Sequence, residues 1–169
     1  MQIHTFDNKK KFQKKNDLYF SRFEIKYILT AKTSAIIQKI IKDFMILDGY
    51  AKFFSDNQYF VRSLYFDNEN YDNFKEKVDG LKIRHKFRIR TYSKEKSDSS
   101  IIYLEKKGRF NERTYKIRNK IEFDQLNTIL NDSDIFKLKK NNIKNILINK
   151  FIIDYFKKKI KPQVIIDYY

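Results

Sequence analysis

From Arg84 to Arg90 the chain carries a cation at every second position, within the run Ile-Arg-His-Lys-Phe-Arg-Ile-Arg-Thr-Tyr that begins at Ile83. Successive side chains of a strand point to opposite faces, so these four cations (Arg84, Lys86, Arg88 and Arg90) share one face. They stand about 7 Å apart and repel one another, so they add little to the stability of the fold. A solvated sheet face also shows such alternation. However, Arg outnumbers Lys here in a Lys-rich chain, and its forked guanidinium is the better phosphate ligand.

Three other segments with strand-like alternation repeat this design. The residues that share a face are Glu24 and Lys26 in Tyr19–Leu29, Glu105 and Lys107 in Ile101–Lys107, and Lys116 and Arg118 in Arg113–Phe123. Each Glu-x-Lys pair taken alone predicts a cross-strand salt bridge. Basic faces on successive strands predict more: a curled sheet whose interior is a cationic channel for an extended chain of phosphates. The two carboxylates are interpreted either as ligands of Mg²⁺ or Mn²⁺ or as partners of the neighbouring Lys side chains.

The remaining segments predict an α+β fold with a largely antiparallel sheet and flanking helices. Further strands are expected at 59–67 and 164–169, and helices after Thr30 and at 69–78, 124–130 and 143–157. Residues 1–17 contain five Lys with little apolar content and predict a flexible basic arm. The 169 residues show no internal repeat and fit one domain, covering residues 18–169.

Composition excludes several classes of protein. The chain has no Cys and two His, which excludes a disulfide framework, a thiolate nucleophile and a His-rich zinc site. No apolar run approaches the ~18 residues of a membrane span. These features predict a soluble protein of the cytoplasm. The formal charge of +16 supports an anionic partner only weakly by itself, and the placement of the charges has to decide which anion is bound.

Five motifs together resemble the VTC domain, the polyphosphate polymerase domain of the triphosphate tunnel metalloenzymes, related to the CYTH group. They are Arg22-Phe-Glu-Ile-Lys26-Tyr27, Val61-Arg-Ser-Leu-Tyr-Phe-Asp67-Asn68, Lys77-Val-Asp-Gly80, the basic strand Arg84–Tyr92, and Leu104-Glu-Lys-Lys107. The resemblance covers about residues 17–169, and the basic strand is its most specific part. Arg22 stands where the wider superfamily has the first Glu of Glu-x-Glu-x-Lys, which agrees with the VTC branch and argues against a cyclase or thiamine triphosphatase.

The resemblance implies an eight-stranded antiparallel tunnel that binds ATP and polyphosphate or tripolyphosphate, with Mn²⁺ or Mg²⁺ assisting transfer of the γ-phosphoryl group. It implies a catalytic role for Arg88, Arg90 and Lys107, which with Lys26 match the family's phosphate ligands. Arg84, Lys86, Lys116 and Arg118 are added to the phosphate ligands by facing and position. Arg62 shares a face with Leu64 and Phe66 and is a weaker candidate. Glu24 and Glu105 are the candidate metal ligands.

The last eight residues, Pro162 to Tyr169, resemble the start of a family strand that continues into an Arg. Two further strands are expected after it, together with the family's main metal-binding Glu beyond Tyr169. The sequence therefore predicts about six of eight strands, as in a fragment or truncated product. A tunnel left open on one side would expose a sheet edge, and such an edge favours self-association.

Three functions remain open at this point. The first is a polyphosphate polymerase-type phosphotransferase, with an inorganic or organic triphosphatase as a close variant. The second is a non-catalytic sensor of polyphosphate or nucleotide, or an inactive fragment. The third, less favoured, is a basic nucleic-acid binder, which predicts RNA binding that survives saturating tripolyphosphate, whereas a tunnel ligand should compete.

Overall fold

The computed structural model describes residues 18–47, 49, 51–53, 58–95, 100–131, 135, 137–138 and 144–169. The basic arm predicted at residues 1–17 lies outside these residues, so its prediction stays untested. Everything below refers to the described part of the chain.

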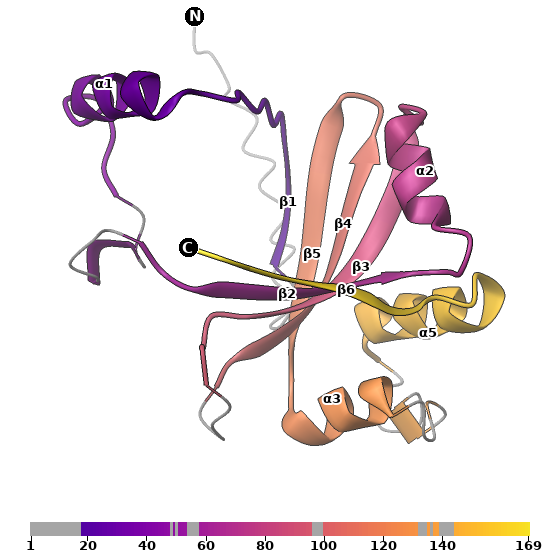
Figure 1. Cartoon of the computed structure of the whole chain (residues 1–169). Helices are drawn as coiled ribbons and strands as arrows, with labels where there is room; N and C mark the ends of the chain where they lie inside the picture. The colour runs from indigo at the N-terminus through magenta and orange to yellow at the C-terminus, as the bar shows by residue number, and fades with distance from the viewer. Residues whose placement is uncertain are drawn as a thin grey trace, which may run out of the picture.

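One six-stranded sheet organises the molecule (Figure 1). Its strands are β1 (Leu18–Arg22), β2 (Val61–Asp67), β3 (Ile83–Thr91), β4 (Ile102–Phe110), β5 (Arg113–Ile121) and β6 (Lys161–Tyr168). Every neighbouring pair is antiparallel, and the order across the sheet is β1-β5-β4-β3-β2-β6. Among the described strands β1 and β6 form the two edges, so the sheet is open. This confirms the predicted α+β fold with its antiparallel sheet and is consistent with an incomplete tunnel.

The helices begin and end at residues with clear local signals. They are α1 (Ala31–Ile41), the short 3₁₀ helix η1 (Ala51–Phe53), α2 (Asp72–Val78), α3 (Phe123–Leu130) and α5 (Ile146–Lys157). The Thr30 hydroxyl caps α1 by accepting a hydrogen bond from the Thr33 amide at 3.1 Å. Asn145 caps α5 in the same way. Gly80, just past α2, has φ of +70°, a conformation that glycine adopts without strain.

The strand register puts the basic side chains of neighbouring strands side by side. Lys86 lies opposite Lys107, and Arg88 lies opposite Glu105. The next strand continues these rows, because Lys107 in turn lies opposite Lys116. Directly opposed residues of a sheet share a face, so the basic residues of β3, β4 and β5 form one continuous surface. We call it the basic face.

The other face of the sheet carries the hydrophobic core. Phe87 and Ile89 of β3 point to this face, where α3 and α5 cover the sheet (Figure 1). Phe151 of α5 is fully buried, with its ring edge-on to Phe66 at 5.1 Å and to Phe87 at 5.4 Å. Other members of this core are Leu104, Ile121, Ile129, Leu147 and Ile148. These side chains are buried between the sheet and the helices, on the face opposite the basic face.

The predicted strand Tyr19–Leu29 was wrong in length. β1 ends at Arg22, and residues 23–30 have no regular structure. Arg22 pairs with Thr114, and β5 begins one residue earlier at Arg113, so the partner strand runs out at this point. Phe23 and Tyr27, whose alternation suggested a strand, are 61% and 77% exposed. Glu24 and Lys26 therefore sit on an irregular segment that continues from β1.

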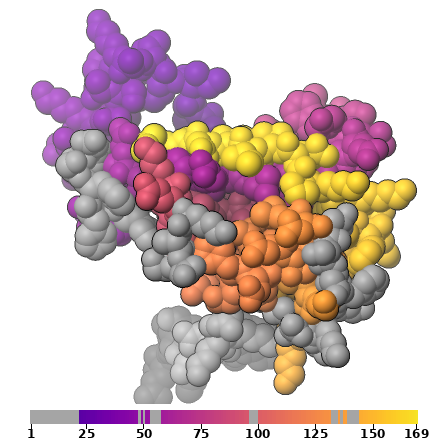
Figure 2. Space-filling view, turned by 60° about the horizontal axis from the view of Figure 1, so that its bottom comes forward, coloured from indigo at the N-terminus to yellow at the C-terminus, as the bar shows by residue number. Residues whose placement is uncertain are grey.

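Helix α1 forms as predicted but has no buried residue. Its apolar side chains, Ile36, Ile37, Ile40 and Ile41, stay 37% to 55% exposed. The helix lies away from the sheet in Figure 1, and Figure 2 shows the same indigo segment projecting from the body of the protein. Its amphipathic pattern therefore predicted the helix correctly but has no partner within the described residues.

Candidate functional site

A cavity of about 740 Å³ opens on the basic face. Ten Lys or Arg residues line it: Arg22, Lys26, Lys77, Arg84, Lys86, Arg88, Arg90, Lys107, Arg109 and Lys116. Glu24 is the one carboxylate among the described lining residues. These residues come from β1, the segment after it, α2, β3, β4 and β5. Such a concentration of positive charge in a concave site attracts a polyanion strongly.

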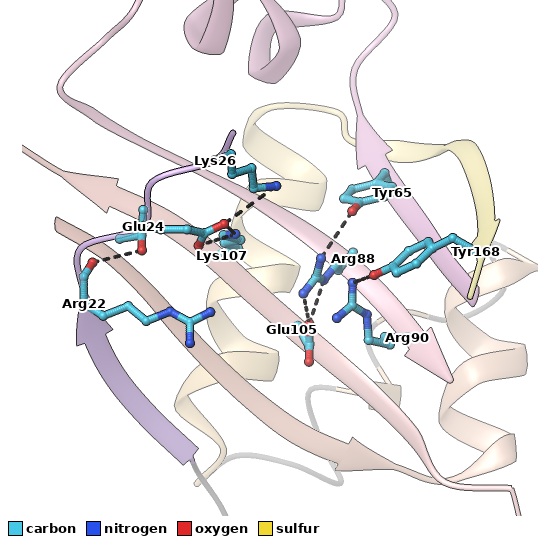
Figure 3. Close-up of polar contacts among 10 residues, drawn as sticks. Arg22, Glu24, Lys26, Tyr65, Arg88, Arg90, Glu105, Lys107 and Tyr168 are labelled. Atoms are coloured by element: carbon cyan, nitrogen blue, oxygen red, sulfur yellow. Dashed lines mark hydrogen bonds and ion pairs between the residues drawn. The ribbon is translucent and has the colours of Figure 1, made fainter. Parts of the chain in front are cut away.

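Arg88 occupies the centre of the basic face and is held rigidly. Its Nε and one terminal nitrogen lie 2.6 Å from Oε2 of Glu105, and its other terminal nitrogen donates to the Tyr65 hydroxyl at 3.2 Å (Figure 3). Burial disfavours the charge of Arg88, but Glu105 and Tyr65 outweigh that cost and keep its pKa raised. Arg88 therefore keeps its charge and a fixed orientation next to the cavity.

Arg90 is held by hydroxyl groups instead of a carboxylate. Its Nε donates to Ser63 at 3.1 Å, and a terminal nitrogen donates to the Tyr168 hydroxyl at 2.7 Å. Neither partner carries a negative charge, so the positive charge of Arg90 remains available to an anion in the cavity. This arrangement suits a phosphate ligand better than Arg88, whose charge is paired with that of Glu105.

Glu24 ties the segment after β1 to the middle of the sheet. Its carboxylate oxygens accept from the Lys107 ammonium at 2.9 and 3.0 Å, and Lys26 lies 3.7 Å away (Figure 3). The hydrogen bond from Lys107 is the main reason why the pKa of Glu24 is lowered. Of the two interpretations of this carboxylate, as a metal ligand or as a partner of Lys side chains, this geometry shows the second.

Two Lys of the basic face are partly desolvated. Burial lowers the pKa of Lys86 and of Lys116, and nearby Arg residues lower it further. The Lys86 ammonium lies 4.5 Å from the centre of the Tyr65 ring, an uncharged partner. An anion bound in the cavity would relieve this crowding of like charges.

Of the nine predicted phosphate ligands, seven line the cavity: Lys26, Arg84, Lys86, Arg88, Arg90, Lys107 and Lys116. Arg62 does not, because it pairs bidentately with Asp167 at 2.7 and 2.8 Å on the edge of the sheet. Arg118 lies on the basic face opposite Glu105 but outside the cavity lining, with its guanidinium 4.5 Å from the Tyr103 ring. Arg84 donates to the backbone carbonyl of Leu81.

Sequence reasoning missed Tyr65 and Tyr168, which hold Arg88 and Arg90, and three of the lining cations. Those cations are Arg22, Lys77 and Arg109. The alternation of side chains along a strand could have identified Arg109, because Arg109 lies on the same face of β4 as Glu105 and Lys107. Lys77 lies on a helix, and no strand pattern points to it.

The candidate metal ligands do not form a metal site by themselves. Glu24 is held by Lys107 and Lys26, and Oε2 of Glu105 is held by Arg88. Oε1 of Glu105 is buried and unpaired within the described chain, but it is a single donor. The described residues contain no group of three His, Cys, Asp or Glu that could hold an ion. Mg²⁺ and Mn²⁺ need several oxygen ligands, so this donor set does not fit them. Their role stays a prediction.

The open antiparallel sheet, with a cationic cavity on one face, is consistent with an incomplete tunnel-like fold. The family model of the VTC domain matches residues 21–169, and the chain belongs to this family. The family is associated with polyphosphate polymerase activity, which suggests polyphosphate or nucleotide as the anion. No curated protein matches the chain. No helix in the described ranges is both long and apolar enough to cross a bilayer.

Proposed function

We propose that this protein is a polyphosphate polymerase-type phosphotransferase that binds ATP and polyphosphate along the basic face. One observation carries the proposal: the cavity gathers ten cations around one carboxylate, on a chain that matches the VTC domain. A linear chain of phosphates carries anionic oxygens along its whole length. It therefore matches a row of cations that runs along β3 and across to β4 and β5.

The reaction needs positioning and neutralisation of charge more than covalent chemistry by the protein. In phosphoryl transfer, negative charge is spread over the oxygens of the transferred group. Fixed positive donors stabilise that charge because they need no reorganisation during the reaction. We assign this role to Arg90 and Lys107 at the cavity wall, with Arg88 held in place by Glu105. Lys26, Lys86 and Lys116 bind the remaining phosphates.

In the transfer, an oxygen of the chain's terminal phosphate forms a bond to the γ-phosphorus while the bond to the leaving oxygen of ADP breaks, and these two oxygens must lie in line. The row formed by Lys86, Lys107 and Lys116 runs across three strands. A phosphate chain can therefore contact cations across the sheet as well as along β3. We propose that this row receives the acceptor phosphate. No step is assigned to a metal ion on Glu24 or Glu105, because those carboxylates are engaged by cations.

A non-catalytic polyphosphate binder is the second candidate. The donor set favours it, because the described residues offer no metal site and no acidic cluster next to the cavity. Such a protein would bind polyphosphate tightly and leave ATP unchanged.

One experiment separates these functions. The chain is incubated with ATP and Mn²⁺, and the products are analysed for polymer and for free phosphate, while tripolyphosphate binding is measured by calorimetry. Polymer supports the polymerase, free phosphate alone indicates a triphosphatase, and binding without turnover indicates a sensor. Absence of binding would overturn all three.

The matched variants are Arg90→Ala and Lys39→Ala. Both remove one positive charge, but Lys39 lies on α1, outside the cavity. We expect Arg90→Ala to weaken tripolyphosphate binding by at least about tenfold, since a charge-assisted hydrogen bond contributes roughly 1.5–3 kcal/mol. Lys39→Ala should bind like the parent. Equal losses in both variants would mean that only total charge matters.

A further inference from the structure

Tyr65 lies among the cations of the proposed site, and no step described so far uses its hydroxyl proton. It stands on β2 directly opposite Arg88 on β3 and lines the cavity. The Lys86 ammonium lies 4.5 Å from the centre of its ring, and the Arg88 guanidinium carbon lies 5.9 Å away. Figure 3 shows its hydroxyl directed toward Arg88. The ring therefore orients two cations without neutralising either of them.

The contact with Arg88 fixes where the proton of the Tyr65 hydroxyl can go. A guanidinium group has donors and no acceptor, so the hydroxyl oxygen must accept the 3.2 Å hydrogen bond. In the part of the chain that the structure describes, this is the one hydrogen bond of that hydroxyl. Lys86 and Arg90, the other charged groups acting on Tyr65, are also donors when charged. The proton is thus left without a protein acceptor at the wall of the cavity.

We propose that Tyr65 contacts the substrate directly, donating its hydroxyl hydrogen bond to an anionic phosphate oxygen while Arg88 holds the hydroxyl oxygen. The inference rests on the proposed function of the cavity and adds a neutral donor to it. A neutral donor binds phosphate without increasing the repulsion among the cations. Both hydrogen bonds of the hydroxyl, one accepted and one donated, are then satisfied in the complex.

The charges around Tyr65 provide a way to separate its two roles. Burial opposes ionisation of this phenol, but the positive charges of Arg88, Lys86 and Arg90 outweigh burial and lower its pKa. From the other packed elements, β6 places the uncharged Val164 opposite Tyr65, and Lys77 of α2 acts on Lys86. A phenolate still accepts from Arg88 but can no longer donate to phosphate, and its negative charge repels the ligand.

The first test compares tripolyphosphate binding by the full chain and by Tyr65→Phe, using calorimetry near neutral pH. Phe keeps the ring beside Lys86 and Arg88 and removes only the hydroxyl. We expect roughly tenfold weaker binding, as for the loss of one hydrogen bond to a charged group. Tyr155→Phe is the matched control, because Tyr155 packs against Phe151 in the core on the other side of the sheet. Equal affinity of Tyr65→Phe and the parent would overturn the inference.

The second test repeats both titrations at increasing pH. Loss of the Lys86 charge weakens binding by both parent and variant, so the affinity of the parent divided by that of the variant reports mainly on Tyr65. We expect the parent's advantage in affinity over Tyr65→Phe to disappear, or to become a disadvantage, as the pH rises through the lowered pKa of Tyr65. A ratio that stays constant would show that the hydroxyl only holds Arg88, which also overturns the inference. Failure of the parent itself to bind tripolyphosphate would instead overturn the proposed function, and this inference with it.

Discussion

Arg88 and Glu105 form an ion pair buried within the sheet, with two nitrogens of the guanidinium 2.6 Å from the same carboxylate oxygen. The side chains are 8% and 0% exposed. The second oxygen of Glu105 and the Nε of Arg118, on the neighbouring strand, are both buried without a partner among the described residues. The centre of the basic face therefore holds charged groups that are almost completely excluded from solvent.

Removing Glu105 should destabilise the fold strongly. Glu105→Ala leaves the guanidinium of Arg88 buried and without its counter-charge, so we expect the free energy of unfolding to fall by about 3 kcal/mol or more. Urea denaturation followed by circular dichroism measures this change. Glu69→Ala, an exposed residue in the turn before α2, is the control and should stay within about 0.5 kcal/mol of the parent. A loss as small for Glu105→Ala would show that the pair is dispensable.

Removing the charge of Glu24 should strengthen ligand binding. The carboxylate occupies the ammonium of Lys107, so a phosphate has to compete with it for this cation. We expect Glu24→Gln to bind tripolyphosphate roughly fivefold more tightly, equivalent to about 1 kcal/mol. Calorimetry with a chelator present excludes metal-mediated binding. Weaker binding by Glu24→Gln than by Glu69→Gln would contradict this role.

The contact between Asp154 and His85 should make stability depend on pH. The His85 Nε2 lies 2.6 Å from Oδ2 of Asp154 and joins α5 to β3. Burial opposes ionisation of Asp154, but the hydrogen bond and charge of His85 outweigh it and lower its pKa. A carboxyl with a lowered pKa stabilises the fold above its unfolded pKa, and this contribution is lost as the pH falls through the folded value.

Asp154→Asn should therefore be less stable than the parent by about 1–2 kcal/mol at neutral pH. The difference should shrink as the pH falls through the lowered pKa of Asp154. Urea denaturation across this range measures it, with the exposed Asp43→Asn as control. A difference that persists unchanged in acid would assign the effect to packing instead of charge.

Gly108 of β4 should not tolerate a side chain. It lies opposite Tyr115 of β5, and a Cβ atom added at Gly108 would overlap the Tyr115 ring. We expect Gly108→Ala to lower the free energy of unfolding by roughly 1–3 kcal/mol, the usual cost of overpacking. In a protein that already carries Tyr115→Ala, the same Gly108→Ala change should lower the free energy of unfolding by less than it does in the parent. Purely additive effects would show that the loss in Gly108→Ala does not come from overlap with the Tyr115 ring.

The strands of the sheet were largely predictable because their side chains alternate between a polar and an apolar environment. The basic strand, predicted within the run Ile83–Tyr92, extends over Ile83–Thr91. Alternation failed after Arg22, where the sequence continues the pattern but β5 extends only one residue, Arg113, beyond the last pair. Strand length depends on the partner as well as on the strand, and one segment of sequence does not contain that information.

The candidate site was predictable where it depends on the alternation of side chains between the two faces of a strand. It was not predictable where it depends on strand register or on contacts between distant segments. This alternation placed Lys86 and Lys107 on the basic face. It could not show that Arg62 pairs with Asp167, because these residues meet only through the register of β2 and β6. The tyrosines that hold Arg88 and Arg90 were missed for the same reason: the partners are 23 and 78 positions apart in the chain.

The strand order also determines how this chain can fold. The strands β3, β4 and β5 follow one another in sequence, and each pairs with the next. Their pairing therefore closes only short loops. The two edge pairings join Leu18 to Arg118 and Val61 to Tyr168, segments 100 and 107 positions apart. Closing such long loops costs more conformational entropy, which delays the contacts that depend on it. We therefore expect the central meander, which carries Arg88 and Lys107, to acquire its protection from hydrogen exchange before either edge strand does.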